Sequence, residues 1–122
     1  MKTILLIEDN NDIRENTCEL LELKGYEVIF AMDGKTRLAS AKQNKPDIIL
    51  CDIMMPETDG YEVIGKLKND IETAHIPFIF LTASNEKRDE EAGYTMGANG
   101  YIRKPFDAEE LFLAVEKCLN AE

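Results

Sequence analysis

The sequence predicts a single α/β domain, a (βα)5 fold in which five strands of a doubly wound parallel sheet alternate with five helices. Three continuous apolar runs, at Ile4–Ile7, Ile48–Cys51 and Phe78–Leu81, are typical of strands buried on both faces of such a sheet. Segments with apolar residues at helical spacing separate these runs. Strands that alternate with helices form a parallel sheet with right-handed crossovers and helices on both faces. The length of 122 residues fits one domain over residues 1–122.

The first strand, Ile4–Ile7, leads into a helix that we expect to end at Gly25, because glycine favours the conformation that closes helices. The apolar stripe of this helix comprises Ile13, Thr17, Leu20 and Leu21. The mixed run Tyr26–Phe30 predicts an edge strand, and Leu38 with Ala41 indicates the helix that follows it.

The second half repeats the alternation. The helix after the third strand is indicated by a stripe of Val63, Ile64, Leu67 and Ile71. Residues 85–96 are polar and include Gly93, so we expect the fourth helix to be the most mobile. The fifth strand, Gly100–Arg103, is short. The last helix has the clearest stripe, with Asp107 as its expected cap and the apolar residues Leu111, Ala114, Val115, Cys118 and Leu119.

The composition argues against several classes of function. A formal net charge of −10 is unfavourable for gripping phosphate backbones, so we expect no direct nucleic acid binding. Cys18, Cys51 and Cys118 are widely spaced, which is typical of small apolar residues in a reducing compartment. The first apolar run is too short for a signal sequence, and no stretch approaches the length of a membrane span. We therefore expect a cytoplasmic protein with no membrane association.

Chemically reactive residues stand where the apolar runs end. Glu8 and Asp9 follow the first run, Asp52 the third, Thr82 the fourth and Lys104 the fifth strand. Ligands of open α/β sheets bind beyond the carboxyl ends of the strands, so these residues would share one crevice if their strands are neighbours.

Such a group of residues suits phosphoryl transfer to an aspartate. Clustered carboxylates repel one another unless a cation joins them, and oxygen ligands favour Mg²⁺ or Mn²⁺ over zinc. An ionised Asp52 can attack phosphorus once this repulsion is offset, while Thr82 and Lys104 hold the remaining phosphoryl oxygens. The product would be an aspartyl phosphate, a reactive group well suited to a switch.

Over its whole length the chain resembles the receiver domain of bacterial response regulators, the CheY-like superfamily of two-component signalling. Six motifs in the usual order carry this resemblance: Ile7-Glu8-Asp9-Asn10, Asp47 to Pro56 (DIILCDIMMP), Asp59-Gly60, Leu81-Thr82-Ala83, Gly97 to Tyr101 (GANGY) and Lys104-Pro105-Phe106. The resemblance implies the flavodoxin-like strand order 2-1-3-4-5.

The resemblance also implies a role for each matching residue. Asp52 matches the phosphoacceptor and Asp9 a direct metal ligand. Glu8 matches the neighbouring acid, which often acts through water, and the backbone carbonyl of Met54 matches a further ligand. The expected cofactor is Mg²⁺, for which Mn²⁺ can substitute.

Five further residues match the switching machinery of the family. Thr82 corresponds to the hydroxyl that moves to the phosphoryl oxygen, and Tyr101 to the aromatic residue that turns inward with it. Ala83 corresponds to the small residue that keeps the site open. Lys104 corresponds to the partner of the phosphoryl group, and its bond to Pro105 is expected to be cis.

The resemblance implies partners rather than an outside substrate, so we do not expect an enzyme that turns one over. A sensor histidine kinase or a phosphotransfer protein would donate the phosphoryl group. An unknown downstream protein would then bind a surface on the last two helices, through which a dimer could also form. The chain could act alone, which we slightly prefer, or form the front part of a longer regulator.

Three other functions fit the sequence less well. A phosphatase of the haloacid dehalogenase type needs a second aspartate two residues after the nucleophile, where this chain has Met54. A flavodoxin-like electron carrier needs a phosphate-binding loop rich in serine and threonine, whereas Glu8 and Asp9 would repel the phosphate. A receiver that serves only as a scaffold would be expected to lack one of the key acids.

Overall fold

The computed structural model describes residues 2–31, 34–53, 60–83 and 87–120, and at residues 34–38 and 60 it describes the backbone alone. Strands and helices alternate along the described chain, as the sequence predicts. The strands are β1 (Thr3–Ile7), β2 (Glu27–Ala31), β3 (Ile48–Asp52), β4 (Phe78–Thr82) and β5 (Gly100–Arg103). The helices are α1 (Asn11–Leu23), α2 (Gly34–Asn44), α3 (Gly60–Lys68), α4 (Lys87–Thr95) and α5 (Ala108–Leu119).

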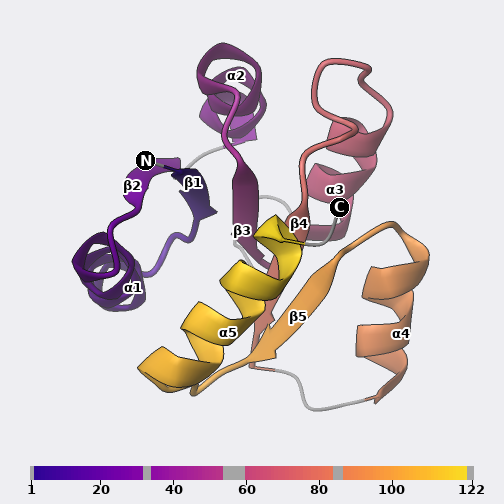
Figure 1. Ribbon diagram of the computed structural model, residues 1–122. Coiled ribbons are helices and arrows are strands. Elements are labelled where there is room, and N and C mark those ends of the chain that lie inside the picture. The colour runs from indigo at the N-terminus through magenta and orange to yellow at the C-terminus, as the bar shows by residue number, and fades with distance from the viewer. Residues whose placement is uncertain (1, 32–33, 54–59, 84–86, 121–122) are drawn as a thin grey trace.

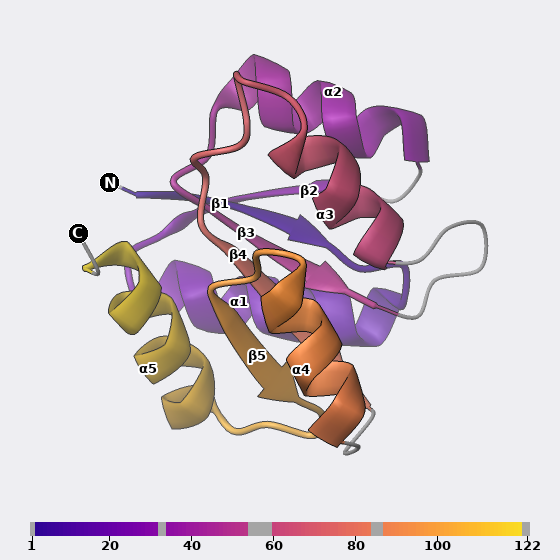
Figure 2. The same ribbon diagram turned by 90° about the vertical axis from the view of Figure 1, so that its right-hand side faces the viewer.

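The strands form one parallel sheet in the order β2-β1-β3-β4-β5, which confirms the expected order 2-1-3-4-5. Helices α1 and α5 cover one face of the sheet, and α2, α3 and α4 cover the other (Figure 1). The arrowheads of β1 and β3 point to the same end of the molecule (Figure 2). The carboxyl ends of the central strands therefore share one edge of the sheet.

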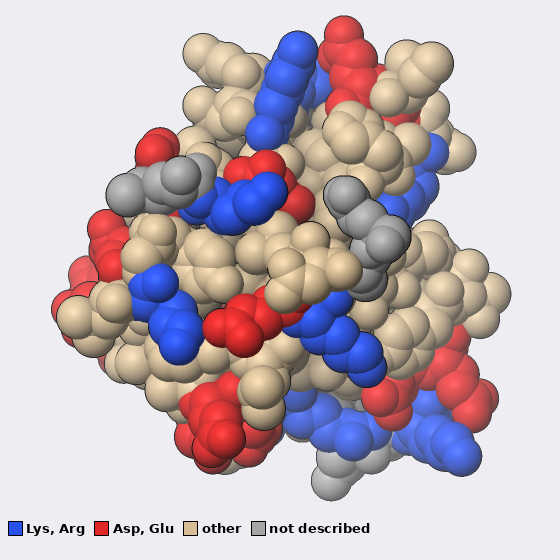
Figure 3. All heavy atoms as spheres, viewed as in Figure 1, with Lys and Arg blue, Asp and Glu red and all other residues tan. Residues whose placement is uncertain are grey.

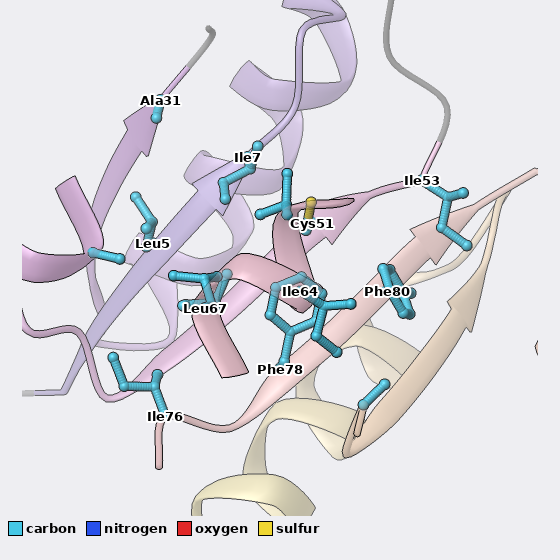
Figure 4. Packing of buried hydrophobic residues seen from close by; sticks show 14 residues of the cluster. Leu5, Ile7, Ala31, Cys51, Ile53, Ile64, Leu67, Ile76, Phe78 and Phe80 are labelled. Carbon is cyan, nitrogen blue, oxygen red and sulfur yellow. The ribbon is translucent and has the colours of Figure 1, made fainter. Parts of the chain in front are cut away.

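Successive residues of the central strands pack into two separate cores because side chains alternate between the faces of a strand. Leu5, Cys51 and Phe80 lie on the face that α2, α3 and α4 cover. They belong to the same core as Ile64 and Leu67 of α3 (Figure 4). Their sequence neighbours, such as Leu6 and Leu50, face α1 and α5. Each buried aliphatic side chain contributes roughly 1.5–3 kcal/mol to stability. The sheet is thus held rigidly from both sides.

Gly25 follows the end of the first helix, and Asp107 precedes the start of the last helix, as the sequence predicts. Gly25 follows α1 with a φ of 98°, a conformation that glycine adopts without strain. The side chain of Asp107 accepts a hydrogen bond from the backbone N–H of Glu110 and so caps α5. At α1 the cap is Asn10, whose side chain accepts from the N–H of Ile13. Neither Glu8 nor Asp9 fills that role, so both carboxylates remain available.

Two details of the predicted stripes are wrong. Ile71 lies beyond α3, which ends at Lys68, and its side chain is 91% exposed. The chain turns there because Thr73 donates both its N–H and its hydroxyl to backbone carbonyls that precede it, including that of Asp70. On α1 the buried positions include Arg14, which the stripe omitted, whereas Ile13 is only partly buried.

Acidic and basic side chains are interspersed on the face of the molecule that Figure 3 shows. Acids outnumber bases in the chain as a whole, 24 to 14. Among the described helices, none combines the length and the apolar character that crossing a membrane requires.

Gly93 of α4 marks a close approach between this helix and the sheet. A Cβ atom at this position would lie 3.0 Å from Cδ2 of Phe80 and 3.6 Å from Cδ2 of Tyr101. Gly65 of α3 provides a matched comparison, because a Cβ atom there would meet nothing within 4 Å.

Gly93→Ala is expected to lower the free energy of unfolding by about 1–3 kcal/mol, since the rigid Phe80 ring must shift to admit the methyl group. Gly65→Ala is expected to raise it by about 0.5–1 kcal/mol, because alanine favours helix without any clash. Urea unfolding followed by circular dichroism measures both. A Gly93→Ala protein as stable as Gly65→Ala would contradict the close packing of α4.

Candidate functional site

The register of the sheet brings acidic residues together at the carboxyl end of the central strands. Ile7 of β1 pairs with Cys51 of β3, so the next residues, Glu8 and Asp52, emerge side by side. Asp52 is itself the last residue of β3, one residue further than the apolar run predicts. The same register continues outward, since Thr82 of β4 pairs with Arg103 of β5. Residues from four neighbouring strands therefore meet at this edge.

Glu8, Asp9 and Asp52 form an acidic cluster. Each offers a carboxylate oxygen, and these three oxygens all lie within 4.8 Å of one another. Glu8 is 1% exposed and Asp52 is 6% exposed, while Asp9 is the most accessible of the three. Carboxylates this close repel one another strongly away from water. The cluster therefore requires positive charge nearby.

Lys104 supplies part of that charge from the end of β5. Its Nζ lies 2.8 Å from Oε1 of Glu8 and 3.5 Å from Oδ1 of Asp52. Its backbone N–H donates to the carbonyl of Thr82 at 2.6 Å, which fixes the strand end that carries the ammonium group. The peptide bond between Lys104 and Pro105 is cis, the geometry that the resemblance implies. The ammonium group thus lies closer to Glu8 than to Asp52.

The protonation of Glu8 reflects its crowded surroundings. Burial, followed by the hydrogen bond and the charge of Asp52, raises the pKa of Glu8 to about 7, although Lys104 acts in the opposite direction. Without a cation, a proton on Glu8 relieves the repulsion between the two buried carboxylates. A divalent ion that binds here must displace that proton.

Thr82 and Tyr101 lie on the opposite side of Asp52, on β4 and β5. Thr82 is buried at the end of its strand. The hydroxyl oxygen of Tyr101 is buried without a hydrogen bond of ordinary geometry, although Thr82 is close enough to affect its pKa. Burial is the main cause that raises the pKa of Tyr101, and the Thr82 side chain lowers it. The Tyr101 side chain is therefore turned inward, with its ring 6.5 Å from that of Phe80.

Of the remaining expected site residues, Ala83 is among the described residues and Met54 is not. Ala83 is exposed and lines the same groove as Lys104 and Pro105, so its small side chain leaves this flank of the site open. Met54, the expected carbonyl ligand, lies outside the described residues.

One residue near the site, Arg14, was missed from the sequence, and a second, Cys51, was expected only as a buried apolar residue of its strand. Arg14 is buried, and its Nη1 donates to the backbone carbonyl of Glu8 at 3.1 Å. Its spacing of three and seven residues from Thr17 and Leu21 places it on the buried face of α1, which a reading of apolar residues alone overlooks. Cys51 is fully buried next to the acids, and its thiol donates to the Asp52 carbonyl at 3.3 Å.

The residues present fit a hard divalent cation. The donors are oxygens alone, as Mg²⁺ prefers. One of them, Oε2 of Glu8, is buried and accepts no hydrogen bond from an N–H or O–H group of the described residues, so a cation would satisfy it. Glu8, Asp9 and Asp52 are the described residues that could hold such an ion.

Comparison with known protein families agrees with this geometry. The family model of the response regulator receiver domain matches residues 4–116. Among curated proteins, the chain is 40% identical over 98% of its length to RpaA of Synechocystis sp., a DNA-binding dual master transcriptional regulator. It is 41% identical, also over 98% of its length, to PhoB of Pseudomonas aeruginosa, the phosphate regulon transcriptional regulatory protein. The chain covers 50% and 52% of these relatives, about half their length.

Solved structures give the same picture. The Vibrio cholerae chemotaxis protein CheY4 is similar with a TM-score of 0.91 and 30% identity, and 97% of this chain and 98% of that chain are covered. The receiver domain of the Pseudomonas aeruginosa sensor histidine kinase PA1611, solved with a magnesium ion in its active-site cleft, is similar with a TM-score of 0.88. It shares 31% identity, and 97% of each chain is covered.

The raised pKa of Glu8 predicts an unusual dependence of stability on pH. In EDTA, the free energy of unfolding is expected to fall as the pH rises from about 5 to about 8, because the folded protein holds the Glu8 proton more tightly than the unfolded chain does. Below the ordinary pKa of 4.5 this contribution is complete, and it is lost as the pH passes through about 7. Mg²⁺ affinity should rise over the same range, since the proton competes with the metal.

Urea unfolding at a series of pH values, with and without Mg²⁺, measures this effect. Glu8→Gln is the control, because an amide does not titrate and the metal-free slope should become flatter. An equally steep slope in Glu8→Gln would assign the effect to another group.

Proposed function

Because this chain belongs to the response regulator receiver domain family, whose members are phosphorylated by histidine kinases, we propose that Asp52 is the residue that accepts the phosphoryl group. The observation that carries the proposal is the position of its carboxylate. Asp52 closes the central strand, within 4.8 Å of oxygens of Glu8 and Asp9 and 3.5 Å from the ammonium group of Lys104. The ammonium group of Lys104 thus contacts both Glu8 and Asp52, and Thr82 ends the neighbouring strand β4.

Glu8 is a poorer candidate for the acceptor. Its raised pKa of about 7 means that a proton still competes for this carboxylate near neutral pH, and it already holds Lys104 at 2.8 Å. Asp9 begins the loop into α1 and is more accessible than Asp52, which suits a metal ligand that keeps water on its other side.

In the proposed reaction, a carboxylate oxygen of Asp52 attacks the phosphorus of the donor's phosphohistidine. A bond between that oxygen and phosphorus forms as the phosphorus–nitrogen bond breaks, and the departing imidazole takes up a proton. Mg²⁺ bound by the acidic cluster would offset the negative charge of both reactants. Lys104, whose Nζ lies 3.5 Å from Oδ1 of Asp52, would pair with the phosphoryl group there.

The same proposal gives Thr82 and Tyr101 a role in the response. The hydroxyl of Thr82 would bind a phosphoryl oxygen, and Tyr101 would occupy the space that Thr82 leaves. The burial of the Tyr101 hydroxyl beside Thr82 supports this coupling. Ala83 and Pro105, on the exposed groove next to Lys104, would leave room for the donor.

Mg²⁺ is the proposed cofactor, and Mn²⁺ could replace it because both prefer oxygen ligands. The proposed ligands are Glu8, Asp9 and Asp52, with the backbone carbonyl of Met54 completing the protein's share. Glu8 would act directly or through water.

The proposed partners are a sensor histidine kinase or phosphotransfer protein and an unknown downstream protein. Exposed apolar side chains on the last two helices, Tyr94 and Leu113, support partner binding or dimerisation there. We propose that residues 1–122 do not bind nucleic acid themselves, because acids are in excess, and that they turn over no outside substrate. The three cysteines form no disulfide, which supports a cytoplasmic location.

Asp52→Asn is expected to abolish labelling by acetyl phosphate and Mg²⁺, because an amide cannot act as the nucleophile, while the fold remains intact. Intact-mass analysis detects the added phosphoryl group, and EDTA should prevent its addition to the parent protein. Asp9→Asn, which keeps the acceptor and weakens metal binding, serves as the comparison and should be labelled more slowly. Undiminished labelling of Asp52→Asn would move the acceptor to another residue.

Thr82→Ala is expected to be labelled but to respond poorly, because the hydroxyl that links the phosphoryl group to Tyr101 is missing. The response can be followed in ¹H–¹⁵N spectra as shifts of the β5 and α4 amides after phosphorylation. Thr82→Ser, which keeps the hydroxyl, should retain those shifts. If Thr82→Ala showed the same amide shifts as the parent protein, Thr82 would not be needed for the response of Tyr101.

A further inference from the structure

Arg14 of α1 is a buried charge that the proposed reaction does not use. Its side chain and backbone together are only 8% exposed. Arginine is rarely buried unless an acid pairs with it. Yet the ion pairs found among the described residues do not include Arg14. Such a residue needs a structural reason for its position.

The hydrogen bonds of Arg14 converge on the loop that carries the acids. Nη1 donates to the carbonyl of Glu8 at 3.1 Å, and Nη2 donates to Oδ1 of Asn11. The backbone N–H of Arg14 also donates to the carbonyl of Asn10 at 2.9 Å. The Glu8 carbonyl belongs to the peptide that joins Glu8 to Asp9, one residue beyond the last paired residue of β1. Arg14 therefore holds the peptide between two proposed metal ligands where the sheet no longer does.

Phe30 explains how the charge is covered. The guanidinium carbon of Arg14 lies 5.2 Å from the centre of the Phe30 ring, a favourable position for a cation over an aromatic face. Phe30 lies on the edge strand β2 and is itself 52% exposed. An exposed phenylalanine on an edge strand is unfavourable by itself, and here it shields the guanidinium group from water.

Arginine suits this position because its donors occupy a carbonyl and an amide and leave the carboxylates open. A lysine at the same place has a single ammonium group and does not match the spread of these acceptors. The guanidinium group reaches the acid loop through a backbone carbonyl and not through a carboxylate. Lys104, in contrast, binds the Glu8 carboxylate itself.

We propose that Arg14 is a positioning residue for the divalent cation: its forked hydrogen bonds set the Glu8–Asp9 peptide so that both carboxylates face the metal. Arg14 touches neither the metal nor the phosphoryl group. The inference rests on the proposed function, since it requires a cation at the acidic cluster.

The test compares Mg²⁺ binding by the parent protein with binding by Arg14→Met, Arg14→Lys and Lys117→Met, using isothermal titration calorimetry. Lys117→Met is the matched control, because Lys117 is an exposed α5 residue near Asp47 and Pro77, which precede their strands at the opposite end of the sheet. Thermal unfolding in EDTA shows how much of each variant is folded. The rate of labelling by acetyl phosphate is then measured as a function of Mg²⁺ concentration.

We expect Arg14→Met to raise the Mg²⁺ dissociation constant by about tenfold, as loss of the groups that orient metal ligands does elsewhere. Its labelling rate at saturating Mg²⁺ should remain within about twofold of the parent, because Asp52 and Lys104 are unchanged. Arg14→Lys should still bind at least about threefold more weakly, and Lys117→Met should bind like the parent. A merely structural role would lower the melting temperature without changing the Mg²⁺ affinity of the folded protein.

Parent-like Mg²⁺ affinity in Arg14→Met would overturn the proposal. If Arg14→Met does not fold, the Mg²⁺ affinity of Arg14→Lys is the deciding measurement. A parent-like affinity of Arg14→Lys would show that a positive charge suffices, and it would overturn the proposal that the two hydrogen bonds of Arg14 position the ligands. A parent protein that binds no Mg²⁺ would overturn the proposed metal site and this inference with it. If only Arg14→Met and Arg14→Lys lose affinity, the proposed function stands and Arg14 positions its metal ligands.

Discussion

The function of this receiver domain depends on the repulsion between carboxylates that the sheet forces together. Parallel pairing of β1 with β3 leaves Glu8 and Asp52 side by side in a buried position, where the chain provides Lys104 as a counter-charge. One ammonium group does not neutralise three carboxylates, and burial, followed by the hydrogen bond and the charge of Asp52, raises the pKa of Glu8. A cation bound at this cluster, as we propose, would offset the charge that Lys104 leaves uncompensated.

In this fold the acidic cluster, which is unfavourable for stability, lies apart from the apolar cores that stabilise the protein. The apolar residues of β1, β3 and β4 pack into two cores, one on each face of the sheet, and the polar residues begin only where the strands end. Helix α1 contributes to both parts, since Leu21 is in a core while Arg14 reaches the acid loop. Rigid cores on both sides allow the strand ends to hold charges that would otherwise move apart.

Much of this could be predicted from residue order alone. Alternating apolar runs and helical stripes gave the α/β class and located every strand to within one residue, because a central strand must be apolar along its length. The neighbours of each strand could not be derived from local patterns, and the order 2-1-3-4-5 came from the resemblance. The stripe through Ile71 was wrong because helical spacing continues past Lys68 by chance, while the backbone turns at Asp70.

The residues that form the site could be predicted from the sequence, but the distances between them could not. The sequence indicated Glu8, Asp9, Asp52, Thr82 and Lys104, because each follows or closes a strand. Residue order did not indicate that Lys104 lies closer to Glu8 than to Asp52, since that depends on the packing of the β5 end against β4. Arg14 was missed because a charged residue in a helix is normally read as exposed, and only its contacts identify it as buried.

The thiol of Cys51 adds an experimental property to the centre of the sheet. The Cys51 side chain is inaccessible to solvent, and its thiol donates a hydrogen bond to the Asp52 carbonyl. A thiol-specific reagent can therefore reach it only when β3 separates from its neighbours. Cys18 is partly accessible on α1 and reacts without such an opening. The alkylation rate of Cys51 relative to that of Cys18 therefore reports the free energy of opening of β3, in the native protein and without an introduced cysteine.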